Sequence, residues 1–355
     1  MTIRPCISAL SAFPSAARHS FVIVLLLSLL LGSCGSPSGD ISNSTATPKT
    51  SGAASAPTFA WRTVLSRNDV QLFGAIDCLT LQRCVSGGHT STTGGMLTTA
   101  DGGATWVWNE IVGSRDVPSL SCPTAQLCYA IAQKQDGDSV VLMSSDGGSS
   151  WRTVSNPNAP TGFGLIYCTS SVDCIAAGFV GLQGALWSTH DGAMSWRRAV
   201  ITIASRNEIA SLYCSSNVRC WATAVGGAAA ATYTSTSGGD TWLPTDGVSG
   251  QVACVAAHRC WSVDGSSIRS SSDGGQTWHT QQVPAHIYFL SSVACLDATD
   301  CYAVGGHDAV RMTSGGTWSL GQVPAGVFIH DVACAARCFA VGESGNRGVV
   351  LALAP

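Results

Sequence analysis

The sequence predicts an all-β fold, a seven-bladed β-propeller with four-stranded blades, and three observations lead to this prediction. A turn motif that ends in tryptophan recurs along the chain, and a cysteine pair recurs with the same period. The repeats also begin with a lone strand and end with one, so that the N-terminal strand can close the last blade. Repeats of about 40 residues with four short strands each are typical of propeller blades.

The turn motif is clearest at 271–278, which reads Ser-Ser-Asp-Gly-Gly-Gln-Thr-Trp. Its aspartate can accept hydrogen bonds from the backbone of its own turn, and its glycines permit the positive φ that such a turn needs. Copies of decreasing similarity lie at 99–106, 144–151, 189–196, 235–242 and 313–318. We expect each copy to join two strands and to bury its closing tryptophan between units. The residues given this structural role are Asp101, Asp146, Asp191, Asp273, Trp106, Trp151, Trp196, Trp242, Trp278 and Trp318.

The period of the repeat is close to 45 residues. Trp61 has no such turn before it, but 61–64 (Trp-Arg-Thr-Val) matches 151–154, so Trp61 starts the series. Successive spacings from Trp61 are 45, 45, 45, 46, 36 and 40 residues. The second unit illustrates the strands that we expect, at 119–122, 128–132, 139–144 and 151–154. Pairing of 348–353 with 61–64 would complete the last blade and cover its open edge.

The cysteines indicate an oxidising compartment. Fourteen of the 16 are paired at short spacing, an even pairing that in an exported chain predicts disulfides. In the chain-entropy model, each bridge across so short a loop contributes about 2 kcal/mol. Zinc binding is the alternative, but two cysteines in each of seven separate units do not converge on the four ligands that zinc takes. We expect no metal and no cofactor, and the predicted disulfides are Cys78–Cys84, Cys122–Cys128, Cys168–Cys174, Cys214–Cys220, Cys254–Cys260, Cys295–Cys301 and Cys334–Cys338.

The N-terminal segment predicts export. Residues 21–31 form an apolar run that is too short for an ordinary membrane span but suits a signal peptide. Leu31-Gly32-Ser33-Cys34 resembles the lipobox of bacterial lipoproteins, which implies that Cys34 is the lipidation site; a plain secretory signal is the alternative. We expect 1–33 to be a lipoprotein signal peptide, 34–58 a flexible Ser/Gly/Pro/Thr-rich tether and 59–355 the propeller. The expected location is the outer face of a bacterial cytoplasmic membrane.

The charge pattern excludes some functions. The formal net charge is −3 and only 11% of residues are charged, so no basic field for nucleic acid is expected. The Gly-Gly pairs belong to turns and do not precede helices, so they are not nucleotide-binding fingerprints.

The turn motifs resemble the Asp-box, or BNR, repeats, and the resemblance covers the whole predicted propeller. Asp-box repeats occur in sialidases, in some other glycoside hydrolases, in propellers similar to the photosystem II assembly/stability factor and in uncharacterised exported bacterial propellers. The dense cysteine pairs and the Ala-Val-Gly at 303–305 and 340–342 look most like the last group. In these families the Asp box lies on the face away from the ligand site. The resemblance therefore implies that the four aspartates are structural and not catalytic.

A sialidase-like site is hard to assemble here. Sialidases use three arginines, a tyrosine activated by a glutamate and an aspartate acid/base, and they usually carry an Arg-Ile-Pro before the first blade. This chain has no Arg-Ile-Pro, and its only glutamates are Glu110, Glu208 and Glu343. A retaining mechanism needs a nucleophile and a proton donor at one bond, and no such pair can be identified. The sequence thus favours a protein without enzymatic activity.

The candidate ligand site lies on the face opposite the Asp boxes, where strands two and three join and where each unit crosses into the next. Arginines in three crossovers, Arg67, Arg115 and Arg206, could bind a carboxylate or an acidic peptide. Alternatively, each pairs with the acid beside it, namely Asp69, Asp116 or Glu208. Further candidates on this face are His307, Asp308, Glu343 and Arg347.

Three functions follow from this pattern. We expect a monomeric, non-enzymatic, lipid-anchored propeller that binds a protein or glycan partner on this face. The first alternative is a sialidase-like glycoside hydrolase that uses the three arginines as an anion clamp. The second is an assembly factor resembling the photosystem II type, which would hold a nascent membrane protein.

Overall fold

The computed structural model describes residues 59–154, 162–201, 208–225, 231–246, 248–255, 258–313 and 315–354. The chain divides into two compact units, Met1–Gly52 and Ala53–Pro355, and all described residues lie in the second. The predicted signal peptide, the lipidation site Cys34 and the tether lie outside the described residues. No helix among the described residues is long and apolar enough to span a membrane.

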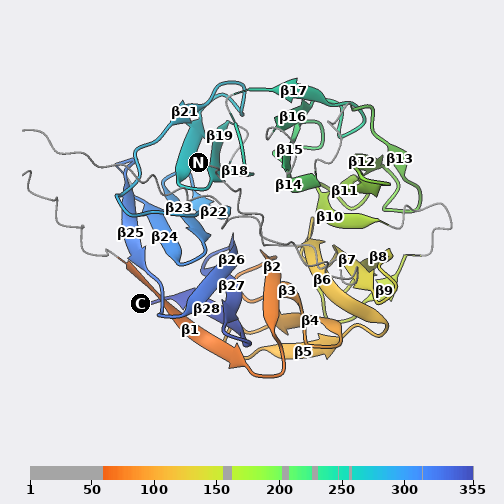
Figure 1. Ribbon diagram of the computed structural model, residues 1–355, viewed down its shortest axis with the longest axis horizontal. Coiled ribbons are helices and arrows are strands. Elements are labelled where there is room, and N and C mark those ends of the chain that lie inside the picture. Colours follow the sequence, from red (N-terminus) through yellow and green to blue (C-terminus); the bar gives the residue numbers. More distant parts are fainter. Residues whose placement is uncertain are drawn as a thin grey trace, which may run out of the picture. The chain divides into compact units, whose positions relative to one another are not determined.

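The second unit is an all-β propeller, with its sheets arranged around a common centre (Figure 1). Five of its sheets have four antiparallel strands each, in chain order from the centre outward. The first comprises β2 (Leu72–Cys78), β3 (Cys84–His89), β4 (Gly94–Thr99) and β5 (Val107–Glu110). The second comprises β6 (Ser114–Ser121), β7 (Cys128–Lys134), β8 (Ser139–Ser144) and β9 (Arg152–Thr153). The third comprises β10 (Phe163–Cys168), β11 (Cys174–Val180), β12 (Gln183–Thr189) and β13 (Arg197–Arg198). The fourth comprises β14 (Glu208–Cys214), β15 (Cys220–Val225), β16 (Ala231–Ser235) and β17 (Leu243–Thr245). The fifth comprises β18 (Gln251–Val255), β19 (Arg259–Asp264), β20 (Ser267–Ser271) and β21 (His279–Thr280).

The other eight strands form one continuous sheet in the order β22-β23-β24-β25-β1-β28-β27-β26. In the order of the chain, its strands are β1 (Phe59–Arg67), β22 (Ser292–Asp297), β23 (Asp300–Gly305), β24 (Asp308–Met312), β25 (Trp318–Gln322), β26 (Val327–Cys334), β27 (Cys338–Ser344) and β28 (Gly348–Leu353).

The predicted number of seven blades is therefore wrong, because the structure has five four-stranded blades and one eight-stranded sheet. The physical reason lies in β1. This strand spans nine residues, not the predicted four, and both of its edges are paired. One edge pairs antiparallel with β28, as expected of the two terminal strands, and the extension at Phe59 and Ala60 pairs parallel with β25. That second pairing joins two groups of strands that the repeat pattern treats as separate.

Buried side chains fill the space between neighbouring sheets. One such cluster joins Ile131 and Val141 of the β6–β9 sheet to Phe163 and Trp187 of the β10–β13 sheet. Phe163 and Trp187 meet edge to face, with their ring centroids 5.1 Å apart. The second and third strands of a sheet have an apolar face for each neighbouring sheet, which accounts for their nearly continuous burial.

Each predicted cysteine pair forms a disulfide in the structure. In every case the bridge joins the end of one strand to the start of the next across their hairpin, and the two Cα atoms lie 3.9–4.1 Å apart. The bridges fix the register of the hairpins that surround the centre.

Of the six tryptophan-ending motifs defined above, which we call the Asp-box turns, four close on their own aspartate. Asp101 accepts a hydrogen bond from the backbone N–H of Thr105 at 2.9 Å and another from its hydroxyl at 2.5 Å. Asp146, Asp191 and Asp273 accept the equivalent pair of bonds. In the fourth turn Ser237 takes the place of the aspartate and accepts the N–H of Thr241 at 2.9 Å. These bonds make the turns self-contained units.

The second glycine of an Asp-box turn lies where a side chain has no room. At Gly275 φ is 82°, and a Cβ would lie 2.2 Å from the ring of Trp221 in the neighbouring sheet. The equivalent glycines Gly103, Gly148 and Gly239 also have positive φ and abut a side chain of the neighbouring sheet. The Gly-Gly repeat thus reflects both turn geometry and the close approach of adjacent sheets.

The closing tryptophans are buried or half-buried. Trp151, Trp242 and Trp278 each donate a hydrogen bond from Nε1 to the carbonyl of the second glycine in their own turn. The indole ring therefore fixes the turn from within and also fills the space beside it.

Candidate functional site

The described residues line a central channel of about 880 Å³. Its wall is built mainly from the strands that begin or end a sheet at the centre, namely β2, β6, β10, β14, β18, β22 and β26. We call these the inner strands. Its size falls in the range of ligand pockets, about 300–1,000 Å³.

The inner strands are linked around the channel by bonds from side chains to backbone. Each disulfide has its first cysteine near the end of an inner strand. The residue just before that cysteine can use a side-chain oxygen to accept the backbone N–H of the first cysteine of the next disulfide along the chain. The pairs are Asp77 with Cys122 (2.8 Å), Ser121 with Cys168 (3.0 Å) and Tyr213 with Cys254 (2.8 Å). Two residues earlier a second set of bonds links Ser119 with Ile166 (3.0 Å), Gln251 with Val293 (2.8 Å), Ser292 with Val332 (3.3 Å) and Asp331 with Ile76 (2.9 Å). These bonds satisfy N–H groups on strand edges that have no further strand to pair with.

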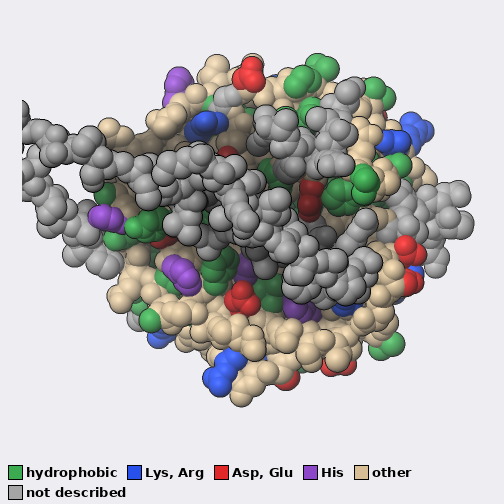
Figure 2. Space-filling view, in the orientation of Figure 1, with side chains coloured by type: hydrophobic (Ala, Val, Ile, Leu, Met, Phe, Trp, Pro, Cys, Tyr) green, Lys and Arg blue, Asp and Glu red, His purple; other side chains and the backbone are tan. Residues whose placement is uncertain are grey.

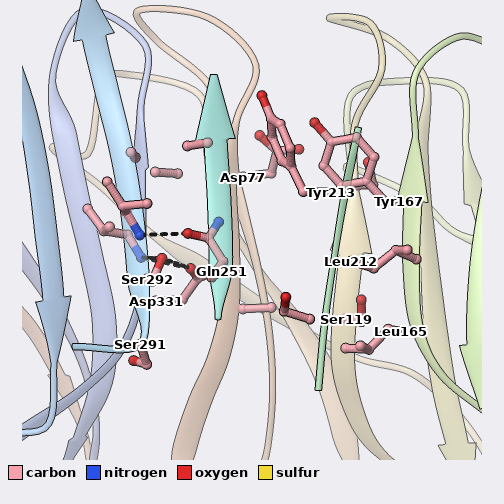
Figure 3. Close-up of a pocket in the computed structure, with 18 of the residues that line it drawn as sticks. Asp77, Ser119, Leu165, Tyr167, Leu212, Tyr213, Gln251, Ser291, Ser292 and Asp331 are labelled. Atoms are coloured by element: carbon pink, nitrogen blue, oxygen red, sulfur yellow. Dashed lines mark hydrogen bonds between the residues drawn. The ribbon is translucent and has the colours of Figure 1, made fainter. Parts of the chain in front are cut away.

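Asp77 and Asp331 are two of the carboxyl groups that line the channel. Figure 3 shows Asp77 near Tyr213 and Tyr167, and Asp331 beside Ser292 and Gln251. Burial raises the pKa of Asp77 to about 6, and the negative charge of Asp331 adds to the increase. Burial also raises the pKa of Asp331, although the Ser292 hydroxyl donates to it at 2.6 Å. Both groups are thus held in surroundings that disfavour their charge.

Two tyrosines share the wall with these carboxyls. The ring centroids of Tyr167 and Tyr213 lie 5.1 Å apart, and burial raises the pKa of both phenols. Tyr213 is held by its hydroxyl, which accepts the N–H of Cys254 and donates to the carbonyl of the same residue at 3.2 Å. The pair therefore presents an ordered aromatic surface.

One mouth of the channel carries aromatic and histidine side chains. The ring of Phe328 lies 5.5 Å from that of His307 and 5.0 Å from that of His330. The Nε2 atom of His330 is buried without a hydrogen-bond partner and lies 3.7 Å from Oε1 of Glu343. Figure 2 shows histidine side chains at several separate places on the face in view, one of them near β24.

The crossover between β21 and β22 reaches the same mouth. Phe289 lines the channel, while Tyr288 is 79% exposed. A single oxygen of Asp308 accepts the backbone N–H groups of Tyr288 at 2.6 Å and of Phe289 at 2.8 Å. The chain reverses direction at every hairpin of a four-stranded sheet. The Cys hairpins and the Asp-box turns therefore lie at one end of the sheets, and the crossovers between sheets lie at the opposite end. We call Tyr288, Phe289, His307 and Phe328 the aromatic rim.

The predicted arginines do not form a common clamp among the described residues. Arg67 lies at the end of β1 and forms a bidentate ion pair with Asp69. Arg115 lies in β6 and donates to the side-chain carbonyl of Gln133 at 2.8 Å. Arg206 lies outside the described residues. The local pairing is thus seen for Arg67, while Arg115 is engaged by an amide and not by its neighbouring acid.

The remaining predicted residues have separate environments. Asp116 and Glu208 lie in inner strands, where burial raises the pKa of each. His307 donates from Nδ1 to the carbonyl of Val327 at 2.5 Å. Asp308 holds the aromatic rim, Glu343 faces His330, and Arg347 is exposed in the turn before β28. The structure therefore brings His307, Asp308 and Glu343 together at one mouth.

The sequence reasoning missed the channel residues. It gave no functional role to Tyr167, Tyr213, Asp77 or Asp331. The available signal is their position, since Asp77, Tyr167 and Tyr213 all immediately precede a first cysteine. Among the described residues, no group of three or more His, Cys, Asp and Glu could hold a metal ion.

Comparisons with known proteins bear on this site. The family model of the photosynthesis system II assembly factor YCF48 matches residues 85–347, which is most of the chain. The chain belongs to the YCF48 family. A search among curated proteins found no match.

Solved YCF48 structures resemble the described fold. One, a YCF48 bound to D1 peptide, superposes with a TM-score of 0.62 at 16% identity, covering 85% of this chain and 99% of that one. YCF48 from Cyanidioschyzon merolae gives 0.60 at 22% identity, covering 83% and 99%. The WD40 propeller domain of Doa1 gives 0.59 at 11% identity, covering 82% and 96%, so likeness at this level shows the fold alone.

Proposed function

We propose that this protein is a non-enzymatic assembly factor that binds a polypeptide segment of its client on the face opposite the Asp-box turns. Membership of the YCF48 family is the observation that carries the proposal. It is supported by the similar fold of a YCF48 that was solved with a D1 peptide.

The aromatic rim supports this choice of face. Tyrosine and other aromatic residues are frequent hot spots of protein interfaces, because a rigid ring covers a large area at low entropic cost. Tyr288 is exposed, yet its backbone is fixed by Asp308. An exposed aromatic side chain on an ordered backbone is suited to binding an extended peptide.

The test is fluorescence anisotropy with a labelled D1 peptide as the probe. We expect saturable binding by the wild-type protein and a loss of about tenfold or more for Tyr288→Ala, which corresponds to about 1.4 kcal/mol. Leu243→Ala is the matched control, because Leu243 is 71% exposed on the outermost strand β17, away from the channel. Equal loss in both variants, or no peptide binding together with binding of a glycan on an array, would contradict the proposal.

We also propose that the propeller is anchored through Cys34, after removal of 1–33, at the outer face of the bacterial cytoplasmic membrane. The lipobox-like sequence before Cys34 supports this anchor. Mass spectrometry of the protein extracted from membranes is expected to show a diacylated N-terminal cysteine. Cys34→Ser should release the protein into the soluble fraction, and retention of that variant in the membrane would argue against the anchor.

A further inference from the structure

The channel is negative and aromatic. Among the described residues that line it are Asp77, Asp264 and Asp331, and none is a lysine or an arginine. An ionised carboxylate in such a place is normally compensated by a cation or by several hydrogen bonds. Asp77 and Asp331 have hydrogen bonds from the backbone but no lysine or arginine partner in this wall. The basic side chain in the wall, His330, partly offsets the rise in the pKa of Asp331 when it is protonated.

The position of these carboxyls is fixed by the fold. Asp77 is held by the N–H of Cys122, and Asp331 by the N–H of Ile76 and the hydroxyl of Ser292. Each therefore keeps its orientation toward the channel without a ligand. Burial raises the pKa of both carboxyls, so their ionised form is disfavoured in the channel. A bound cation would stabilise that ionised form.

The wall around the carboxyls also suits an organic cation. The rings of Tyr167 and Tyr213 offer π faces to a positive group, an interaction worth more when the partners are desolvated. A buried histidine, His330, also lines the channel, and its Nε2 lacks a hydrogen-bond partner. That nitrogen is a further polar group that is not satisfied within the described protein.

We propose that the channel binds an alkylammonium or guanidinium group, carried either by a lysine or arginine side chain of a bound polypeptide or by a free polyamine. The carboxylates of Asp77 and Asp331 supply the charge, and the tyrosine rings cover the alkyl stem. Calcium suits the site poorly, because it takes six to eight oxygen ligands and these carboxylates already accept backbone hydrogen bonds. Among the described residues, the wall offers no lysine or arginine side chain to an anion.

The test is calorimetric titration of the disulfide-intact protein with cadaverine at pH 7.5, above the pKa of Asp77. We expect Asp77→Asn and Asp331→Asn each to weaken cadaverine binding by at least tenfold, since each removes one charge. Asp77→Asn keeps an oxygen to accept the N–H of Cys122, whereas Asp331→Asn keeps only one of the two oxygens that accept the N–H groups of Ile76 and Val332. Tyr167→Leu is expected to weaken it severalfold. The matched control is Glu110→Gln, which removes one negative charge at an exposed position on β5. Near-UV circular dichroism checks that each variant is folded.

A second arm distinguishes the source of the cation. A D1-derived peptide with one lysine is compared with the same peptide carrying N-acetyllysine. Binding that depends on the free lysine and on Asp77 assigns the group to a polypeptide, whereas binding of cadaverine alone assigns it to a free amine. Cadaverine binding that is equal in the wild type and both Asn variants, or that calcium abolishes at matched ionic strength, would overturn the proposal.

Discussion

Asp77 offers a direct test of the account of the channel, because its charge should destabilise the fold. Burial raises its pKa from 3.8 to about 6. Below pH 4 the carboxyl is protonated in both the folded and the unfolded chain, so it does not change the free energy of unfolding. Between pH 4 and 6 the unfolded chain releases the proton first, so the free energy of unfolding falls as the pH rises; above pH 6 the loss is complete.

The size of this effect follows from the pKa. A difference of about two between the folded and unfolded pKa corresponds to about 3 kcal/mol. Asp77→Asn keeps an oxygen to accept the N–H of Cys122 but cannot ionise. We therefore expect the variant to match the wild type near pH 4 and to exceed it in the free energy of unfolding by about 2–3 kcal/mol at pH 7.

The assay is urea unfolding of the oxidised protein at pH 4.5, 6 and 7.5, followed by tryptophan fluorescence. The relevant quantity is the change with pH of the difference between variant and wild type, because other titrating groups cancel in that difference. Glu110→Gln is the control for a general change in net charge and should show a flat difference. A flat difference for Asp77→Asn as well, or a variant that loses stability relative to the wild type as the pH rises, would refute the reasoning.

Other predictions concern the Asp-box turns. Gly275→Ala should lower the free energy of unfolding, measured in urea, by about 1–2 kcal/mol because of its positive φ and by about 1–3 kcal/mol more because of the clash with Trp221. Gly137 is the control, because its φ is 91° and no atom lies near a Cβ there. Gly137→Ala should therefore lose only the contribution of the positive φ, about 1–2 kcal/mol. Hydrogen bonds from its own turn lower the pKa of Asp146 to about 2, so the stability that they give is lost as the pH falls from about 4 to 2. Asp146→Asn should therefore have a lower melting temperature than the wild type at pH 5. Its melting temperature should also fall less between pH 4 and 2. His190 lies between two carboxylates, which raise its pKa, so its contribution is present below pH 6.5 and lost as the pH rises through the folded pKa. His190→Gln should therefore lower the melting temperature more at pH 6 than at pH 8.5, and an equal decrease would count against this pairing.

Much of the fold could be predicted because the signals are local. The strands expected at 119–122, 128–132, 139–144 and 151–154 correspond to β6, β7, β8 and β9. β6 begins five residues earlier than expected, and the other three differ by at most two residues at either end. Turn chemistry and cysteine spacing act within about ten residues, so a single sequence shows them. The number of blades was predicted wrongly, because the parallel pairing of β1 with β25 joins segments that are distant in the chain and carries no repeat signal.

The candidate site was less predictable for a similar reason. Asp331 and Ile76 are bonded to each other although 255 residues separate them. Which inner-strand residue faces the channel depends on how neighbouring inner strands align, and the sequence of one strand does not reveal this. The residues at the mouth were easier to find, because hairpin loops carry His307, Asp308 and Glu343 to the face that topology predicts.

The central claim is that a polypeptide binds over the channel mouth opposite the Asp-box turns. Hydrogen–deuterium exchange with and without the D1 peptide tests it most directly, because it reports every peptide segment at once. The account predicts slower exchange in 286–291 and 326–330 when the peptide is bound, with the Asp-box turns unchanged. Protection confined to the Asp-box turns, or no protection at saturating peptide, would contradict it.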